Sequence, residues 1–299
     1  MPFTFHSHSG QFCKHGYGQL EETIQAAISK GMPIIGLTEH VPRWRAQDLY
    51  PEEQGLVPSD LEATFSAYVA EARQLQAKYQ DKIEIVIGCE SEYITQLDIA
   101  KAKDMQELYE LDYIVGSVHH IDEIPMDFSA ELYEQIVAKY NGDRVAVFQR
   151  YFELQYEMLQ ALQPTVVGHF DLVRIFHPQD QADPLLADAE VRALAERNIA
   201  YIVSYGGVVE VNSRAWKKGL RDAYPQRDLM QAILQRGGRI TLSDDSHGSG
   251  DVAMHYNRLY AYLQEMHVEK VHCVRQGGRI EVFVGAMQDE FWAKNGLNK

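Results

Sequence analysis

The segment FTFHSHSGQFCKHG (residues 3–16) places three histidines and one cysteine directly after a short apolar run. The run Phe3–Phe5 predicts a strand, in which alternate side chains point to the same face. His6 and His8 should therefore lie side by side, where two imidazoles can bind one metal ion. A pair of solvent-exposed histidines near a terminus is the simpler alternative, and the pattern in the rest of the chain distinguishes the two.

Short apolar runs of the same kind recur along the chain, and each one leads into a polar residue. The seven predicted strands and the residues that follow them are Phe3–Phe5 before His6-Ser-His8, Pro33–Leu37 before Thr38-Glu39-His40, Ile83–Ile87 before Gly88-Cys89-Glu90, Tyr113–Val118 before His119-His120, Thr165–Val167 before Gly168-His169, Val208–Val211 before Asn212, and Arg239–Leu242 before Ser243-Asp244-Asp245-Ser246-His247. Seven of the 12 histidines follow these strands, far more than a random scatter would place there. A converging metal site explains this placement better than isolated histidines do.

Helical patterns alternate with the strands. They cover Leu20–Lys30, Ser59–Tyr79, Asp143–Leu162, Leu185–Arg197, Arg227–Arg236 and Asp251–Met266. Ser59 and Glu62 have the spacing of a capping box at a helix start. Alternating strands and helices predict a parallel sheet, and functional residues after every strand predict an α/β barrel of the TIM type. We therefore expect one barrel domain over residues 1–299, with the long connections Val41–Pro58 and Ile121–Asp143 at the rim of its pocket.

The composition limits the partners of this chain. Its net charge of −15 argues against nucleic acids and anionic membranes, which both reward a basic surface. No apolar run approaches the ~20 residues of a membrane span, and no signal peptide is recognisable. Three widely spaced cysteines are typical of a reduced, cytoplasmic protein. A phosphorylated small molecule stays compatible with the acidity, because bound metal ions can reverse the local charge of a pocket.

Taken together, the motifs resemble the PHP (polymerase and histidinol phosphatase) superfamily from about residue 3 to at least residue 250. The resemblance is carried by His6-Ser-His8, Leu37-Thr-Glu-His40, Gly88-Cys-Glu90-Ser-Glu-Tyr93, Gly116-Ser-Val-His119-His-Ile, Gly168-His169-Phe-Asp and Asp245-Ser-His247. Ile124–Phe128, Glu210-Val-Asn212 and the LSDDSH form of the last motif resemble the histidinol-phosphate phosphatase branch. This resemblance implies a distorted (β/α)7 barrel that holds two or three divalent ions, zinc, manganese or iron.

The resemblance also implies a ligand set for each metal ion. The first ion would take His6, His8, Glu90 and Asp245; the second would share Glu90 and add His119 and His169; the third would take His15, His40 and His247. Three positions have a neighbouring rival: Cys13 beside His15, Glu92 beside Glu90, and His120 beside His119.

The implied reaction is hydrolysis of L-histidinol phosphate to L-histidinol and phosphate in histidine biosynthesis. Glu90, Asp245 and His247 are then the expected catalytic residues, with a metal-bound water, His247 and Asp245 as alternative proton donors to the leaving alkoxide. Arg174 and Arg214 are the expected phosphate ligands, because a guanidinium binds phosphate through two hydrogen bonds. Ser117 is a further candidate for a phosphate hydrogen bond.

The substrate also carries an ammonium and an imidazole, which a carboxylate outside the metal cluster would recognise. Candidates adjacent to the motifs are Glu92, Asp122, Glu123 and Glu210. In a chain this acidic, each of them could equally be an ordinary surface residue.

Other protein classes share parts of this pattern. An amidohydrolase also carries an HxH strand, but here Glu90 stands where that class has a bridging lysine. A PHP phosphoesterase for another small monoester or a nucleotide is closer, although a nuclease would need a basic groove. A metal-binding module without catalysis is the alternative from a different class.

Overall fold

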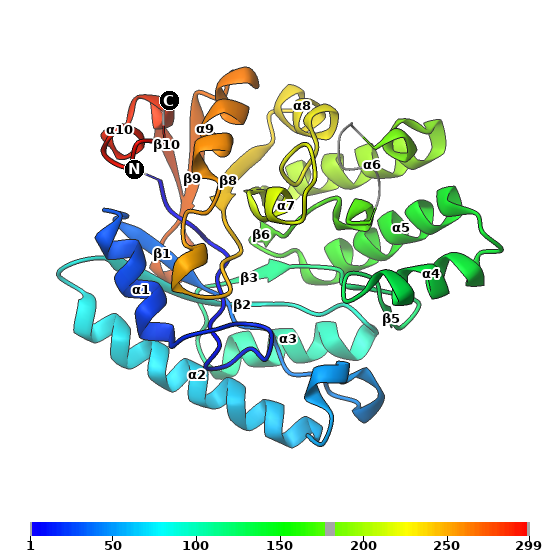
Figure 1. Ribbon diagram of the computed structural model, residues 1–299, viewed down its shortest axis with the longest axis horizontal. Helices are drawn as coiled ribbons and strands as arrows, with labels where there is room; N and C mark the ends of the chain where they lie inside the picture. The colour runs from blue at the N-terminus through cyan, green and yellow to red at the C-terminus, as the bar shows by residue number, and fades with distance from the viewer. Residues whose placement is uncertain (1, 177–182, 298–299) are drawn as a thin grey trace.

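Six parallel strands form the curved sheet at the centre of the molecule, in the order β1-β2-β3-β6-β7-β8 (Figure 1). The computed structural model describes residues 2–176 and 183–297, so His177 lies outside the described residues. The strands of the sheet are β1 (Ile34–Leu37), β2 (Glu84–Glu90), β3 (Tyr113–Gly116), β6 (Val166–Val167), β7 (Val208–Asn212) and β8 (Arg239–Ser243). They correspond to the last six of the seven strands that the sequence predicts.

The N-terminal segment (residues 3–8) lies between the two edges of this sheet. Thr4 forms a parallel bridge with Ile35 of β1, and Ser7 forms one with Ser246 beyond β8. It is therefore held by isolated bridges and is not a continuous strand, which corrects the prediction for Phe3–Phe5. Backbone hydrogen bonds tie Thr4 to Gly36 and Phe5 to Leu242, but the pairing is not continuous, because the amide of Ser7 donates to the side chain of Thr38. The bridged segment nevertheless completes a distorted (β/α)7 TIM-like barrel.

Helices lie around the outside of the curved sheet (Figure 1). They are α1 (Leu20–Ser29), α2 (Pro58–Tyr79), α3 (Gln96–Leu108), α4 (Ala130–Lys139), α5 (Arg144–Leu162), α6 (Ala189–Tyr205), α7 (Arg214–Lys217), α8 (Arg227–Gln235), α9 (Tyr256–Glu265) and α10 (Glu290–Lys294). The sequence patterns missed α3, α4, α7 and α10. The expected cap of α2 was also wrong: Pro58 occupies the first turn, and the Asp60 carboxylate accepts from the amide of Val57.

Two antiparallel pairs of strands stand apart from the barrel sheet, and neither was predicted. They are β4 (His120–Ile121) with β5 (Ile124–Pro125), and β9 (Lys270–Val274) with β10 (Ile280–Val284). Asp122 and Glu123 form the two-residue turn between β4 and β5, both with positive φ, 48° and 67°. This hairpin, together with α4, occupies the long connection after β3.

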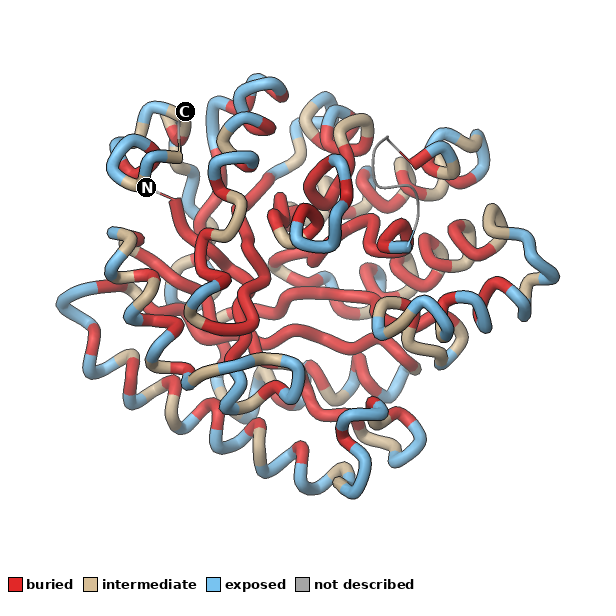
Figure 2. The backbone as a smooth tube through the Cα atoms, viewed as in Figure 1, coloured by how far each residue is buried: buried red, intermediate tan, exposed pale blue. Residues whose placement is uncertain are grey.

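The strands of the barrel sheet are largely buried, whereas β10 and the outward faces of the helices are exposed (Figure 2). Inside the barrel, the Tyr113 hydroxyl donates to the carbonyl of Phe5. A Cβ at Gly36 would collide with this hydroxyl, so the glycine is needed for the close approach. Among the described residues, no helix is both long and apolar enough to cross a bilayer.

Candidate metal centre

Glu90, the last residue of β2, lies at the centre of a ring of histidines at the carboxyl ends of the strands. Its side chain is 1% exposed. Oε1 lies 3.0–3.2 Å from ring nitrogens of three histidines, namely His6, His119 and His169. Oε2 lies 3.3 Å from His8 Nε2 and 3.1 Å from His40 Nδ1. Because the two oxygens face different histidines, this carboxylate has the geometry to bridge two metal ions.

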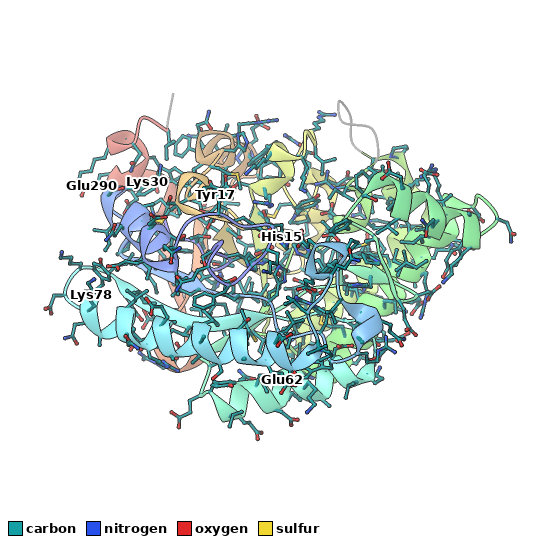
Figure 3. All side chains as sticks on the ribbon, turned by 60° about the horizontal axis from the view of Figure 1, so that its bottom comes forward. His15, Tyr17, Lys30, Glu62, Lys78 and Glu290 are labelled. Carbon is teal, nitrogen blue, oxygen red and sulfur yellow. The ribbon has the colours of Figure 1, made fainter. Side chains whose placement is uncertain are left out.

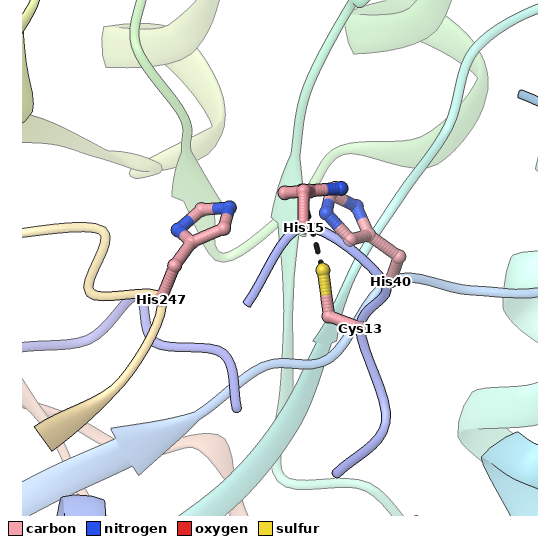
Figure 4. Close-up of side chains that lie close together, drawn as sticks. All are labelled: Cys13, His15, His40 and His247. Carbon is pink, nitrogen blue, oxygen red and sulfur yellow. Dashed lines mark hydrogen bonds between the residues drawn. The ribbon is translucent and has the colours of Figure 1, made fainter. Parts of the chain in front are cut away.

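The predicted ligands come together in three neighbouring groups. In the first, Asp245 Oδ1 lies 3.8 Å from His6 Nε2 and 3.6 Å from His8 Nε2. In the second, His119 Nε2 lies 3.2 Å from His169 Nε2, and both nitrogens approach Glu90. The third contains His15, His40 and His247, together with Cys13, with one donor atom of each within 4.8 Å of the others (Figure 4).

The unpaired atoms of these side chains match the requirements of divalent metal ions. Among the described residues, His6 Nε2 and both ring nitrogens of His8 and His40 are buried without a hydrogen-bond partner. Buried polar atoms are normally paired, so this many unpaired nitrogens in one place fits donors that bind a cation. Imidazole and carboxylate donors suit zinc, manganese and iron. The site therefore has the character of a divalent metal centre.

Carboxylates behind the histidines fix which ring nitrogen faces the centre. Nδ1 of His6 lies 3.1 Å from Glu210, Nδ1 of His119 lies 2.9 Å from Glu92, and Nδ1 of His15 lies 2.7 Å from Glu52. In each case Nε2 is left for the metal. Carboxylate partners of this kind are typical of metal-binding histidines, because they fix the tautomer and raise ligand basicity.

The electrostatics of the centre follow from burial and from this charge pattern. Burial alone would raise the pKa of Glu90, but the imidazoles of His6 and His119 hold it well below its usual range. Burial lowers the pKa of His40 to about 3 and that of His247 well below its usual value. Both rings are therefore neutral near pH 7, which is the form that binds a metal ion.

A cavity of about 420 Å³ opens over the centre. Its wall includes ligands of all three groups and also residues to which the sequence patterns gave no role in the site: Tyr50, Glu52, Asp127, Phe128, Lys218 and Tyr224. The first four come from the two long connections that were expected to form the rim. The other two follow β7, where no histidine or acidic motif drew attention to them.

Arg214 is the predicted phosphate ligand that lies on the cavity wall. Its amide donates to Asn212 Oδ1 at 2.8 Å, which fixes the start of α7. Its Nη1 donates to the carbonyl of Asp245 at 2.9 Å, so the guanidinium lies beside the metal ligands.

Arg174 and Ser117 do not lie on the described cavity wall. Arg174 is buried against Asp171 at 2.7 Å, stacks over the ring of Tyr224, and donates to two backbone carbonyls. The ion pair and the carbonyls satisfy its guanidinium within the fold. Ser117 is 1% exposed and lies beneath the wall, next to Gly168.

The carboxylates proposed to recognise an ammonium group are also placed elsewhere. Glu92 and Glu210 are fully buried behind histidines. Asp122 pairs with Arg150 and Glu123 with Arg45, on the hairpin turn. The periodicity of the sequence could not predict these pairings, because the partners come from distant segments.

His119 and His120 point in different directions from adjacent positions. His119 Nε2 faces Glu90, whereas the His120 ring packs 5.5 Å from the ring of Tyr50 and contributes to none of the three groups. The structure thus brings the nine predicted ligands together and leaves Glu92 and His120 outside the groups.

Comparisons with known proteins agree with this architecture. Residues 4–214 match the model of the PHP domain family. A "probable histidinol-phosphatase" of Schizosaccharomyces pombe is 44% identical, over 98% of this chain and 97% of the relative. The histidinol-phosphatase of Saccharomyces cerevisiae is 32% identical, over 87% of this chain and 88% of the relative.

A solved structure shares the fold. It is the histidinol phosphate phosphatase of Lactococcus lactis, crystallised with zinc, L-histidinol and phosphate. The two structures superpose with a TM-score of 0.70, at 20% identity, over 94% of this chain and 98% of the other. The family match and the two similar full-length relatives lead to one conclusion: this chain belongs to the PHP domain family, among its histidinol-phosphatases.

Proposed function

We propose that this protein is a metal-dependent phosphatase that hydrolyses L-histidinol phosphate to L-histidinol and phosphate, a step of histidine biosynthesis. The observation that carries the proposal is the position of Glu90 among three donor groups, under a cavity that also presents Arg214. The similarity to full-length histidinol-phosphatases supports the choice of substrate.

We propose three metal positions, matching the three donor groups, of which at least the two that share Glu90 are filled with zinc, manganese or iron. The zinc bound to the Lactococcus lactis protein supports this choice of metal. When bound, such ions neutralise the charge on a phosphate and activate water for attack on phosphorus.

The residues of this chain bind and orient the substrate over that centre. Arg214, beside Asp245, would donate to phosphate oxygens and counter the charge that develops during hydrolysis. Water adds to phosphorus as the ester bond breaks, and one proton must reach the leaving alkoxide. Asp245 and His247 both line the cavity. As metal ligands both would be engaged by the ions, and burial keeps the pKa of His247 well below its usual value, so a water molecule in the cavity would supply this proton.

The far wall of the cavity suits the other end of this substrate. Glu52 and Asp127 offer carboxylates to a cation, and Tyr50 stacks on Phe128 with ring centroids 5.8 Å apart. An ammonium group gains from the carboxylates, and an imidazole gains from the aromatic rings. These residues replace Glu92, Asp122, Glu123 and Glu210 as the proposed contacts with the amino alcohol.

Substrate choice is tested with a panel of phosphate monoesters and a phosphate-release assay. Histidinol phosphate should exceed a neutral alcohol phosphate of similar size in kcat/KM by at least ~10-fold, about 1.4 kcal/mol. Asp127→Asn should reduce this preference while the rate with the neutral ester is kept. Equal rates across the panel would indicate a general phosphatase and contradict the assignment to histidinol phosphate.

Metal removal should abolish activity and destabilise the fold. Each ion held at 100 times its Kd stabilises the folded state by about 2.7 kcal/mol, because the unfolded chain does not bind it comparably. A chelator should therefore lower the midpoint of thermal unfolding, and zinc or manganese should restore it. Elemental analysis should find more than one metal equivalent per chain. At most one equivalent after reloading would contradict the shared centre.

A further inference from the structure

Cys13 lies among the histidines of the third donor group. Its side chain is buried, with 6% of the residue exposed. Sγ lies 3.2 Å from His15 Nε2, and one donor atom each of Cys13, His15, His40 and His247 lies within 4.8 Å of the others. Figure 4 shows these four side chains together, brought from the N-terminal loop, the end of β1 and the loop after β8.

The loop that carries Cys13 is tightly built. The amide of Cys13 donates to the carbonyl of Ser9 at 2.9 Å, and Ser9 in turn donates through its amide and its hydroxyl to Glu39. Downstream, the amide of Tyr17 donates to the carbonyl of His247 at 2.8 Å. The loop is therefore fastened both to the β1 side and to the β8 side of the third group. Figure 3 shows His15 and Tyr17 on it, ahead of α1.

The ring of His15 is oriented so that its free nitrogen faces the same space as the thiol. Glu52 lies 2.7 Å from Nδ1, which leaves Nε2 directed at Cys13 Sγ. His40 adds two buried ring nitrogens without a hydrogen-bond partner. The donors of this group thus converge from all sides, as ligands of one ion would.

A nucleophilic role is the rival explanation, because Cys13, His15 and Glu52 follow one another like a thiol, a base and an orienting acid. The position of Cys13 relative to the main cavity argues against this nucleophilic role. His15 and Glu52 line the main cavity, whereas Cys13 does not and instead lines a small neighbouring pocket of about 30 Å³, too small for the substrate. A substrate on the metal centre would therefore meet the imidazole and not the sulfur.

We propose that Cys13 is the fourth protein ligand of the third metal ion, completing a site of one cysteine and three histidines with His15, His40 and His247. The proposal rests on the metal centre of the proposed function and adds a ligand to it. One thiolate and three imidazoles form a complete tetrahedral set for zinc. A thiolate also favours zinc over manganese. The third ion would then differ from the two that share Glu90, which are bound through nitrogen and oxygen donors.

Four protein ligands leave a tetrahedral zinc ion without an open position, as in structural sites. The third ion would then hold the N-terminal loop against the barrel and place its charge beside the cavity. A metal-bound thiolate also makes this position sensitive to oxidation, because oxidised sulfur no longer serves as the ligand. Oxidants should therefore release this ion before the other two.

Cobalt reports the ligand directly, because a thiolate bound to Co²⁺ gives a charge-transfer absorption in the near ultraviolet. Wild-type protein loaded with Co²⁺ should show this absorption. Cys13→Ser should lose this absorption. It should also bind the third ion at least ~10-fold more weakly, which is the smallest loss of metal affinity seen when a residue that hydrogen-bonds a metal ligand is removed. Cys273→Ser is the matched control, because Cys273 is buried in β9, remote from the metal groups, and should keep both the absorption and the affinity.

A second measurement needs no variant. Iodoacetamide labelling followed by mass spectrometry should modify Cys13 at least ~10-fold more slowly in zinc-loaded than in chelated protein, because a metal-bound thiolate is a poor nucleophile. Cys273, which is 1% exposed, is the internal control for general opening of the fold, and the change at Cys13 should exceed any change at Cys273. Metal-loaded wild type without a thiolate band, or Cys13 labelling that ignores zinc, would overturn the proposal while the phosphatase assignment stands. Failure to bind any metal would instead overturn the proposed function.

Discussion

Glu90→Gln should leave no measurable phosphatase turnover and should lower the metal content of the purified protein. The carboxylate approaches five histidines within 3.3 Å, so its charge is shared by at least two donor groups. Gln keeps the shape but removes the charge that offsets two dications. The loss of activity should exceed ~100-fold, the upper end of the cost of removing a residue that only hydrogen-bonds a metal ligand. Activity, elemental analysis and thermal unfolding on the same preparation test this.

Glu92→Gln is the matched comparison, two residues further along the chain. Glu92 holds Nδ1 of His119 and does not line the cavity, so its replacement should weaken metal binding about 10–100-fold without stripping the centre. The preference for histidinol phosphate over a neutral ester should stay unchanged, in contrast to the expectation that Glu92 contacts the substrate ammonium. A Glu92→Gln protein without metal, beside a Glu90→Gln protein that is still active, would show that the bridging carboxylate was misassigned.

Arg214→Ala should lower kcat/KM about 10²–10³-fold, the usual cost of removing one donor that stabilises developing charge. Its guanidinium lines the cavity beside Asp245, where it pairs with Asp251 at 3.4 Å and lies 4.0 Å from the Asp245 carboxylate. Arg214→Lys should recover part of the rate, because it keeps the charge but not the paired hydrogen bonds. The midpoint of thermal unfolding should change little.

Arg174→Ala should show the opposite profile. Arg174 pairs with Asp171 in the interior, and truncating one partner of a buried pair costs about 3–5 kcal/mol of folding free energy. Thermal unfolding should therefore occur at a lower temperature, while the protein that stays folded keeps its KM. A large fall in kcat/KM for a stable Arg174→Ala protein, with Arg214→Ala unaffected, would reverse the two roles.

Local sequence patterns were enough to predict the architecture and the composition of the centre. Strand runs that each end in His, Glu, Asp or Asn repeat along the chain, and the carboxyl ends of parallel strands meet at one face of a barrel. This reasoning needs only local periodicity and chain order. It therefore predicted six of the strands and the strand-end residues from His6 to His247 that the structure brings together, whereas His15, on a loop, came from the family resemblance. Family resemblance supplied the grouping of these residues by metal ion and the substrate.

The roles of residues beyond the strand ends depend on the tertiary structure. Glu90 and Glu92 are both acidic and nearly adjacent, yet one faces the ring of histidines and the other lies behind it. Arg174 and Arg214 follow similar motifs, yet a distant loop and a buried aspartate hold the first inside the fold. Cys13 joins His40 and His247 across more than two hundred residues of sequence. The reason is physical: past the end of a strand, the direction of a side chain depends on the path of its loop and on partners from other segments, which periodicity does not encode.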